Sequence, residues 1–243
     1  MNLGHPLRGS REVAVGCPVG TLILKKRKGK MAITSQELLK QRMAKLGVLL
    51  TSHPKHRIFM DYGLQSWFNY PYHILLGYDD LEIPEDINYP IIKETFTSGY
   101  PAGKLGHVRG ELTLMKEGGR LLADKGFEYI FKSASDTTCY RWYNFRRLFD
   151  VLIGGKLDFV LCGTAAIFGR VDSFNKCMEL YHEHLTVGGA ELYFDSQIRK
   201  FNMTTRREKA PFWESVLGRI HVQGEYAICN QITVSDTWSL DKV

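Results

Sequence analysis

The stretch that decides the fold is Gly126-Phe-Glu-Tyr-Ile-Phe-Lys-Ser-Ala-Ser-Asp136. Its first part is a short apolar run that is typical of a buried strand, and it ends in small polar residues followed by a carboxylate. Before it, apolar residues recur at helical spacing and predict an amphipathic helix; they are Leu105, Val108, Leu112, Met115 and Leu122. A helix followed directly by a buried strand indicates an α/β unit.

The same alternation of helices and strands extends toward the amino terminus. A capping box, Thr34-Ser-Gln-Glu37, predicts a helix that carries apolar residues as far as Leu46. Strands are predicted at 46–51 and 72–76, and Pro54 predicts the start of a helix between them.

Toward the carboxyl terminus the alternation continues. The pattern predicts a helix containing Leu148 and Leu152, one continuous strand over 158–168, and a helix with a buried stripe from Val171 to Leu185. This rhythm predicts an α/β fold with a mainly parallel, Rossmann-like sheet flanked by helices on both faces.

Other segments lack a clear period. Residues 1–33 are predicted to form a basic, flexible extension, and residues 34–243 a single domain. The proline-rich segment 84–101 is expected to be a loop. Near the carboxyl terminus only weak strands are predicted, at 215–222 and 226–232.

The composition suits a globular protein with anionic partners. The chain is 44% hydrophobic and 24% charged, with a formal net charge of +6 and a pI near 9.0. These values suit nucleotide diphosphates, nucleic acid or lipid headgroups without choosing among them. The five cysteines form no CxxC pair and are odd in number, which favours a reduced, cytoplasmic location. The early apolar stretch 20–24 is far shorter than a membrane span needs, so no transmembrane segment is expected.

Polar residues follow the predicted strands, at the edge where ligands bind in parallel sheets. They are Thr51, Ser52 and His53 after one strand, Asp79 and Asp80 after the next, and residues 133–138 after the third. Asp79 and Asp80 also suit the start of a turn, and Asp136 also suits the cap of a helix near Tyr140.

These strings, in this order, resemble the GT-A glycosyltransferase fold, family 2 in particular. The resemblance rests on Leu49-Leu-Thr51-Ser-His-Pro, Leu75-Leu-Gly-Tyr-Asp79-Asp80 and the stretch 126–136, and it covers roughly residues 46–230. It implies a transferase that moves a sugar from a nucleotide-diphosphate donor to an acceptor hydroxyl with inversion. The acceptor is not identified: a glycan and modified DNA both fit, and a homo-oligomer is a further partner to consider.

The resemblance also implies which residues bind the donor. Thr51, Ser52, His53, Asp79 and Asp80 would hold the base and ribose. Ser135 and Asp136 stand at the acidic motif, and the residues at the start of the long helix lie where its amino terminus meets a diphosphate; they are Lys104, His107 and Arg109.

The family's metal-binding Asp-x-Asp motif is degenerate in this chain. It falls on Ala134-Ser135-Asp136, so only the last acid is present. A divalent cation, Mn²⁺ or Mg²⁺, is still expected, with Asp136 and His221 as its protein ligands. The alternative is that no metal is held and that the basic residues of the helix start carry the phosphate charge.

A later segment, Gly188-Gly-Ala-Glu191-Leu-Tyr-Phe-Asp195, supplies the candidate catalytic carboxylate. Inverting transfer needs a base that takes the proton of the acceptor hydroxyl. The glycines predict that Glu191 lies in the first turn of a helix, and Asp195, one turn further along, is the rival. The pair His182 and His184 is predicted to be surface rather than a metal site.

Three other functions compete with this interpretation. A nucleotidyltransferase usually has a glycine-rich loop after the first strand, but 51–57 contains no glycine. A glycosyltransferase acting on modified DNA would use the basic segment 25–30 and show salt-dependent binding. A non-catalytic nucleotide- or nucleic-acid-binding protein of the same fold would bind without turnover.

Overall fold

The computed structural model describes residues 34–67, 70–135, 137–139, 145–162, 166–208, 215–216, 219–220 and 229–231. The expected extension 1–33 and the two expected metal ligands, Asp136 and His221, lie outside these ranges.

The centre of the molecule is a seven-stranded sheet in the order β3-β2-β1-β4-β7-β6-β8. Its strands are β1 (Leu46–Ser52), β2 (Ile74–Tyr78), β3 (Glu94–Thr97), β4 (Tyr129–Ala134), β6 (Phe159–Cys162), β7 (Ala166–Arg170) and β8 (Thr205–Glu208). Strand β7 runs antiparallel to both of its neighbours, and every other neighbouring pair in this sheet is parallel. The predicted mainly parallel sheet is therefore confirmed, with one reversed strand.

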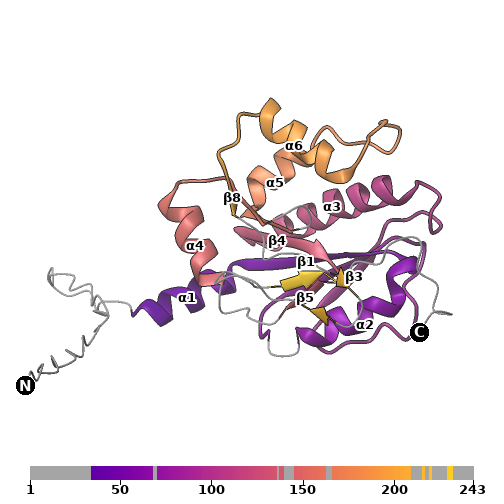
Figure 1. Ribbon diagram of the computed structural model, residues 1–243, viewed down its shortest axis with the longest axis horizontal. Helices are drawn as coiled ribbons and strands as arrows, with labels where there is room; N and C mark the ends of the chain where they lie inside the picture. Colours follow the sequence, from indigo (N-terminus) through magenta and orange to yellow (C-terminus); the bar gives the residue numbers. More distant parts are fainter. Residues whose placement is uncertain are drawn as a thin grey trace, which may run out of the picture.

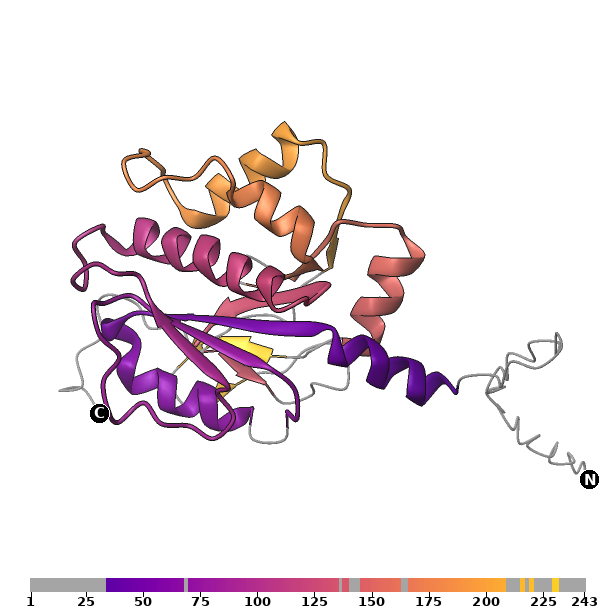
Figure 2. The same cartoon turned by 180° about the vertical axis from the view of Figure 1, so that it is seen from behind.

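Helices cover both faces of this sheet (Figures 1 and 2). On one face lie α1 (Ser35–Ala44), α2 (Arg57–Ser66), which follows a short 3-10 turn at Pro54–His56, and α4 (Phe145–Gly154). On the other face lie α3 (His107–Asp124), α5 (Val171–Met178) and α6 (Ala190–Lys200).

Strand β1 divides the apolar core into two halves. Leu50 packs in the cluster under α2 and α4, and Leu49, the residue before it, packs in the cluster under α3, α5 and α6. Both side chains are fully buried. Alternation along a strand that is covered on both faces explains why this segment reads as a continuous apolar run.

A late segment of the chain pairs with residues that follow β4 and forms a separate two-stranded sheet. Strand β11 (Cys229–Gln231) pairs antiparallel with β5 (Thr137–Cys139), which follows β4 almost directly. The other late strands, β9 (Ser215–Val216) and β10 (Arg219–Ile220), form a separate antiparallel pair.

Two predicted elements differ in the structure. The single strand expected over 158–168 is two antiparallel strands, β6 and β7. Both lie inside the sheet and are covered on two faces, so the apolar run gives no sign of the break between them. The helix expected to reach Leu185 ends at Met178. Tyr181 still reaches the core, but from a turn in which its N–H bonds to the Met178 carbonyl (3.1 Å).

Two short strands of the seven-stranded sheet were not predicted, and neither was β5. Strand β3 lies within the proline-rich segment expected to be a loop, and β8 carries only polar and charged residues. Both are edge strands, where exposure weakens the apolar signal. The predicted cap of α1 is confirmed, because the Thr34 hydroxyl accepts a hydrogen bond from the Glu37 N–H (3.2 Å). No helix in the described ranges is long and apolar enough to span a bilayer.

Candidate functional site

A hollow opens at the carboxyl ends of β1, β2 and β4, and we call it the strand-end hollow. It is lined by Thr51, Ser52, His53, Asp79, His107, Glu111, Leu114, Lys132, Ala134 and Glu191. Six of these residues were predicted to belong to the site: Thr51, Ser52, His53, Asp79, His107 and Glu191. The parallel sheet brings them together because the ends of its strands meet at one edge.

The floor of the strand-end hollow is held by bonds between the ends of β1 and β4. The Ser135 hydroxyl donates to the Ser52 hydroxyl (2.7 Å), and the Ser135 N–H donates to the Thr51 carbonyl (2.8 Å). Ser52 in turn donates to the sulfur of Met60 (3.2 Å). Ser135, another predicted residue, is fully buried and therefore supports this floor rather than facing a ligand.

His53 is oriented by its neighbours. Its Nδ1 accepts a hydrogen bond from the Lys55 N–H (3.0 Å), and its Nε2 lies 3.8 Å from the Asp79 carboxylate. Neither nitrogen is directed at the adjacent Ser52 hydroxyl, which bonds elsewhere. Although serine, histidine and aspartate meet here, the arrangement is not that of a hydrolytic triad, in which the histidine bonds the serine.

Asp79 is buried against the first turn of α3. A Cβ built on Gly110 would come within 2.1 Å of its carboxylate, so the helix approaches it closely because that position is glycine. Burial raises the pKa of Asp79, while a hydrogen bond from Ser98 and the charge of His107 act in the opposite direction. Burial outweighs both, so the net effect is a raised pKa and the charged form of this carboxyl is disfavoured relative to water.

Besides Ser135 and Asp195, three predicted residues in the described ranges do not line this hollow: Asp80, Lys104 and Arg109. The Asp80 carboxylate accepts hydrogen bonds from the backbone N–H groups of Leu81 (2.7 Å) and Ala102 (3.2 Å), so it shapes the following loop. Lys104 is exposed and lies over the Tyr100 ring, 5.8 Å from its centroid.

Arg109 points the other way from His107 and donates to the Glu183 carbonyl (3.3 Å). Positions two apart on a helix face different directions, so the expected basic group at the start of α3 does not converge. Of its three members, His107 alone lines the strand-end hollow.

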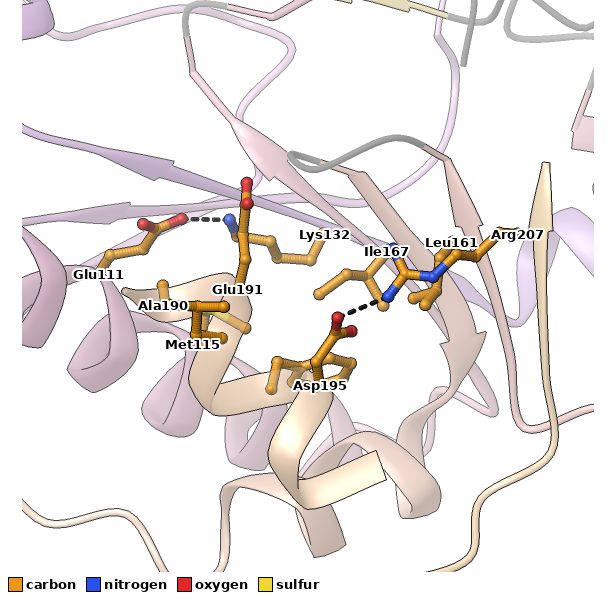
Figure 3. A pocket seen from close by; sticks show the side chains of 11 residues that line it. Glu111, Met115, Lys132, Leu161, Ile167, Ala190, Glu191, Asp195 and Arg207 are labelled. Carbon is orange, nitrogen blue, oxygen red and sulfur yellow. Dashed lines mark hydrogen bonds and ion pairs between the residues drawn. The ribbon is translucent and has the colours of Figure 1, made fainter. Parts of the chain in front are cut away.

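A second hollow, the α6 hollow, adjoins the first and lies between α6 and the strands β4, β6 and β7 (Figure 3). It shares Glu111, Lys132 and Glu191 with the strand-end hollow. Its remaining lining residues are Met115, Leu161, Ile167, Ala190, Leu192, Phe194, Asp195 and Arg207. Two ion pairs border a mostly apolar floor: Lys132 with Glu111, and Arg207 with Asp195 at 2.5 Å.

The two candidate bases differ in their surroundings. As predicted, α6 begins after Gly189 and carries Glu191 in its first turn. Glu191 is exposed and lines both hollows. Asp195 is partly buried, is held by Arg207 and lines only the α6 hollow. Glu191 is therefore better placed to meet a substrate that spans the two.

Glu111 and Lys132 belong to the site, but the sequence did not predict them. Lys132 is 4% exposed and lies within β4, between Leu49 of β1 and Ile167 of β7. Its ammonium pairs with Glu111, one turn into α3. A lysine in a strand with apolar neighbours was the available signal, since such a residue needs a partner when buried.

No residues in the described ranges gather into a metal site of three or more His, Cys, Asp or Glu side chains. His182 and His184 lie in the exposed segment after α5, with ring centroids 6.4 Å apart, as predicted for surface residues. The described side chains therefore supply no ligand set for the expected divalent cation.

The chain matches no protein-family model, and no curated protein matches it. The function must therefore be inferred from the site itself.

Proposed function

We propose that this protein is a glycosyltransferase that moves a sugar from a nucleotide-diphosphate donor to an acceptor hydroxyl, with inversion at the anomeric carbon. The observation that carries the proposal is the meeting of Glu191 with the strand-end residues of β1, β2 and β4 in one hollow. The resemblance of the same strand ends to the GT-A fold supports it.

The donor would lie across the two hollows. Its nucleoside would occupy the strand-end hollow beside Thr51, Ser52 and His53, and its sugar would extend into the α6 hollow. This orientation places the anomeric carbon beside Glu191, which lines both. The apolar floor would contact the C–H face of the sugar, and the bordering charged groups would bond its hydroxyls.

In the reaction, the acceptor oxygen attacks the anomeric carbon from the face opposite the diphosphate. The new carbon–oxygen bond forms as the bond to the phosphate oxygen breaks, and that oxygen keeps the electron pair. Glu191 takes the acceptor proton as general base. A divalent cation, Mn²⁺ or Mg²⁺, would neutralise the diphosphate in the family that the chain resembles, but the described residues show no site for it, so no step is assigned to it.

The hollow also bears on the acceptor. Asp79, Glu111 and Glu191 place several carboxylates along its wall. An acceptor that is itself a polyanion would add its charge to that of the donor diphosphate beside these carboxylates, so we propose a neutral hydroxyl compound such as a glycan rather than DNA. We include a cytoplasmic location in the proposal because the cysteine pattern favours it, and Cys177 is a buried free thiol.

Nucleotide binding tests the donor site directly. UDP and GDP, each with and without Mn²⁺, are added during thermal unfolding. At about 100 times Kd, we expect one of them to raise Tm by about 5 °C or more, because a ligand that binds only the folded state stabilises it. A panel in which no nucleotide raises Tm would remove the proposal.

Catalysis is tested with UDP-glucose and GDP-mannose by measuring release of the nucleotide diphosphate. Glu191→Gln should lower kcat by about 10²- to 10⁴-fold and leave nucleotide binding unchanged, since it removes the base but keeps the shape. Asp195→Asn is the comparison. If that variant loses turnover while Glu191→Gln keeps it, Asp195 is the base.

A further inference from the structure

The pair formed by Lys132 and Glu111 is unusual for its position. Lys132 lies in an inner strand of the sheet, and its side chain is 5% exposed, whereas that of Glu111 is 24% exposed. Replacing such a buried pair by apolar residues of similar volume is often neutral or stabilising. Stability alone therefore gives little reason for a lysine at this point of β4.

Lys132 and Glu191 line the same part of the site. Both side chains line both hollows, together with Glu111. In Figure 3 the Lys132 ammonium bonds the Glu111 carboxylate, and the side chain of Glu191 extends from α6 into the same region. The Lys132 ammonium thus pairs with Glu111 from α3, and Glu191 from α6 lines the same two hollows as this pair.

Other charged or titratable groups around the hollows belong to several elements. They are His53 after β1, Asp79 after β2, His107 in α3, Asp195 in α6 and Arg207 in β8. Asp195 and Arg207 pair with each other, and His53 lies beside Asp79. Lys132 differs from these groups, because Lys132 and its partner Glu111 both line the two hollows that Glu191 also lines.

We propose that Lys132 is a positioning residue for the general base: its buried ammonium, shared between Glu111 and Glu191, keeps Glu191 ionised and directed into the strand-end hollow. Glu111 anchors the ammonium and competes with Glu191 for it. A base must be ionised to accept a proton, and a neighbouring cation favours its charged form, while a neighbouring carboxylate disfavours it. The role of Glu191 as a base rests on the proposed function. The effect of the Lys132 charge on the ionisation of Glu191 does not.

Substitutions of Lys132 and of Glu111 should shift the pH at which Glu191 is protonated in opposite directions. In Lys132→Met, Glu191 loses its cation, so it should become protonated at higher pH, by about one pH unit. In Glu111→Gln, a like charge and a competitor disappear, so Glu191 should be protonated at lower pH than in the wild type. Lys132→Arg keeps the charge and should restore most of the wild-type behaviour.

The experiment measures the Glu191 carboxyl by ¹³C NMR in protein labelled at the glutamate side-chain carboxyl, with Glu191→Gln assigning the signal. The same variants are assayed for turnover of UDP-glucose and GDP-mannose across pH, where the acid limb should move with the NMR titration. Lys125→Met is the matched control, because it breaks another ion pair, with Glu94 at 2.7 Å, whose two residues line neither hollow. It should shift neither curve.

Unchanged Glu191 titration in both Lys132→Met and Glu111→Gln would overturn the inference, as would shifts of the same sign. If Lys132→Met fails to fold, Lys132→Gln, which also removes the positive charge, replaces it in the same titration. If the wild type turns over no donor, the proposed function fails, but the NMR titration still tests the charge relation.

Discussion

Asp79 shows how one residue can be part of a site at a cost to stability. Burial raises its pKa above the ordinary value of 3.8. From pH 3.8 upward the unfolded chain releases this proton while the folded chain still holds it, so the free energy of unfolding falls until the pH passes the raised pKa. Asp79→Asn cannot ionise. Relative to the wild type, the variant should therefore gain stability across that window, measured by urea unfolding from pH 4 to 8.

Asp158 provides the opposite control. Its burial would raise its pKa, but hydrogen bonds from Ser173 and Thr204 outweigh burial and lower it. Its ionised form thus stabilises the fold above its unfolded pKa, and the benefit is lost as pH falls through the lowered value. Asp158→Asn should lose stability relative to the wild type in the range where Asp79→Asn gains it. Parallel curves for the two variants would contradict the assignment.

At this scale the sequence located site residues at strand ends and in the first turns of helices, but not those further inside an element. Thr51 and Ser52 end β1, and His53 and Asp79 directly follow β1 and β2; strand ends are where parallel sheets bind ligands. Lys132 and Glu111 reach the same hollow from within a strand and a helix. Which helix face meets which strand depends on packing across the chain, and a local pattern does not contain that information.

Helix α3 packs closely on the sheet at Gly118, and the missing side chain of this glycine makes the approach possible. A Cβ on Gly118 would come within 2.5 Å of the buried Leu49 side chain on β1. Gly118→Ala should therefore destabilise the protein by about 1–3 kcal/mol, despite the better helix propensity of alanine, because the helix or Leu49 must move. Chemical denaturation measures the change.

Gly154→Ala is the matched control for this element. Gly154 ends α4, and an added Cβ would meet no atom within 4 Å. Alanine there should leave stability unchanged or raise it by up to about 1 kcal/mol. If Gly118→Ala were as stable as Gly154→Ala, close packing of α3 on β1 would not explain the glycine.

The elements themselves differed in how well the sequence predicted them. The helix α3 was predicted within two residues at its start, because its apolar stripe faces a sheet while its other face meets solvent. The strands β6 and β7 were merged, since both are buried and no alternation marks their ends. The edge strands β3 and β8 were missed because few of their residues are apolar.

For the whole molecule, the alternation of strands and helices predicted the layers but not the strand order. Nothing local distinguishes β7, the one strand that runs antiparallel to both of its neighbours in the sheet, from a parallel strand. The late pairing of β11 with β5 likewise joins segments about ninety residues apart in sequence. Contacts of that range depend on the complete fold.

The two halves of the core share one sheet, so we expect them to unfold together. Leu49 and Leu50 are adjacent in β1, are fully buried and face opposite halves. Leu49→Ala and Leu50→Ala should each cost about 2–5 kcal/mol, since each leaves a cavity in a close-packed cluster. Far-UV circular dichroism and intrinsic fluorescence should give one coincident transition in both variants.

Leu38→Ala, at a side chain 40% exposed on α1, should cost about 0.5 kcal/mol or less. Two separate transitions in either core variant would show that the halves are independent, because a shared central strand cannot remain folded on one face after losing the other.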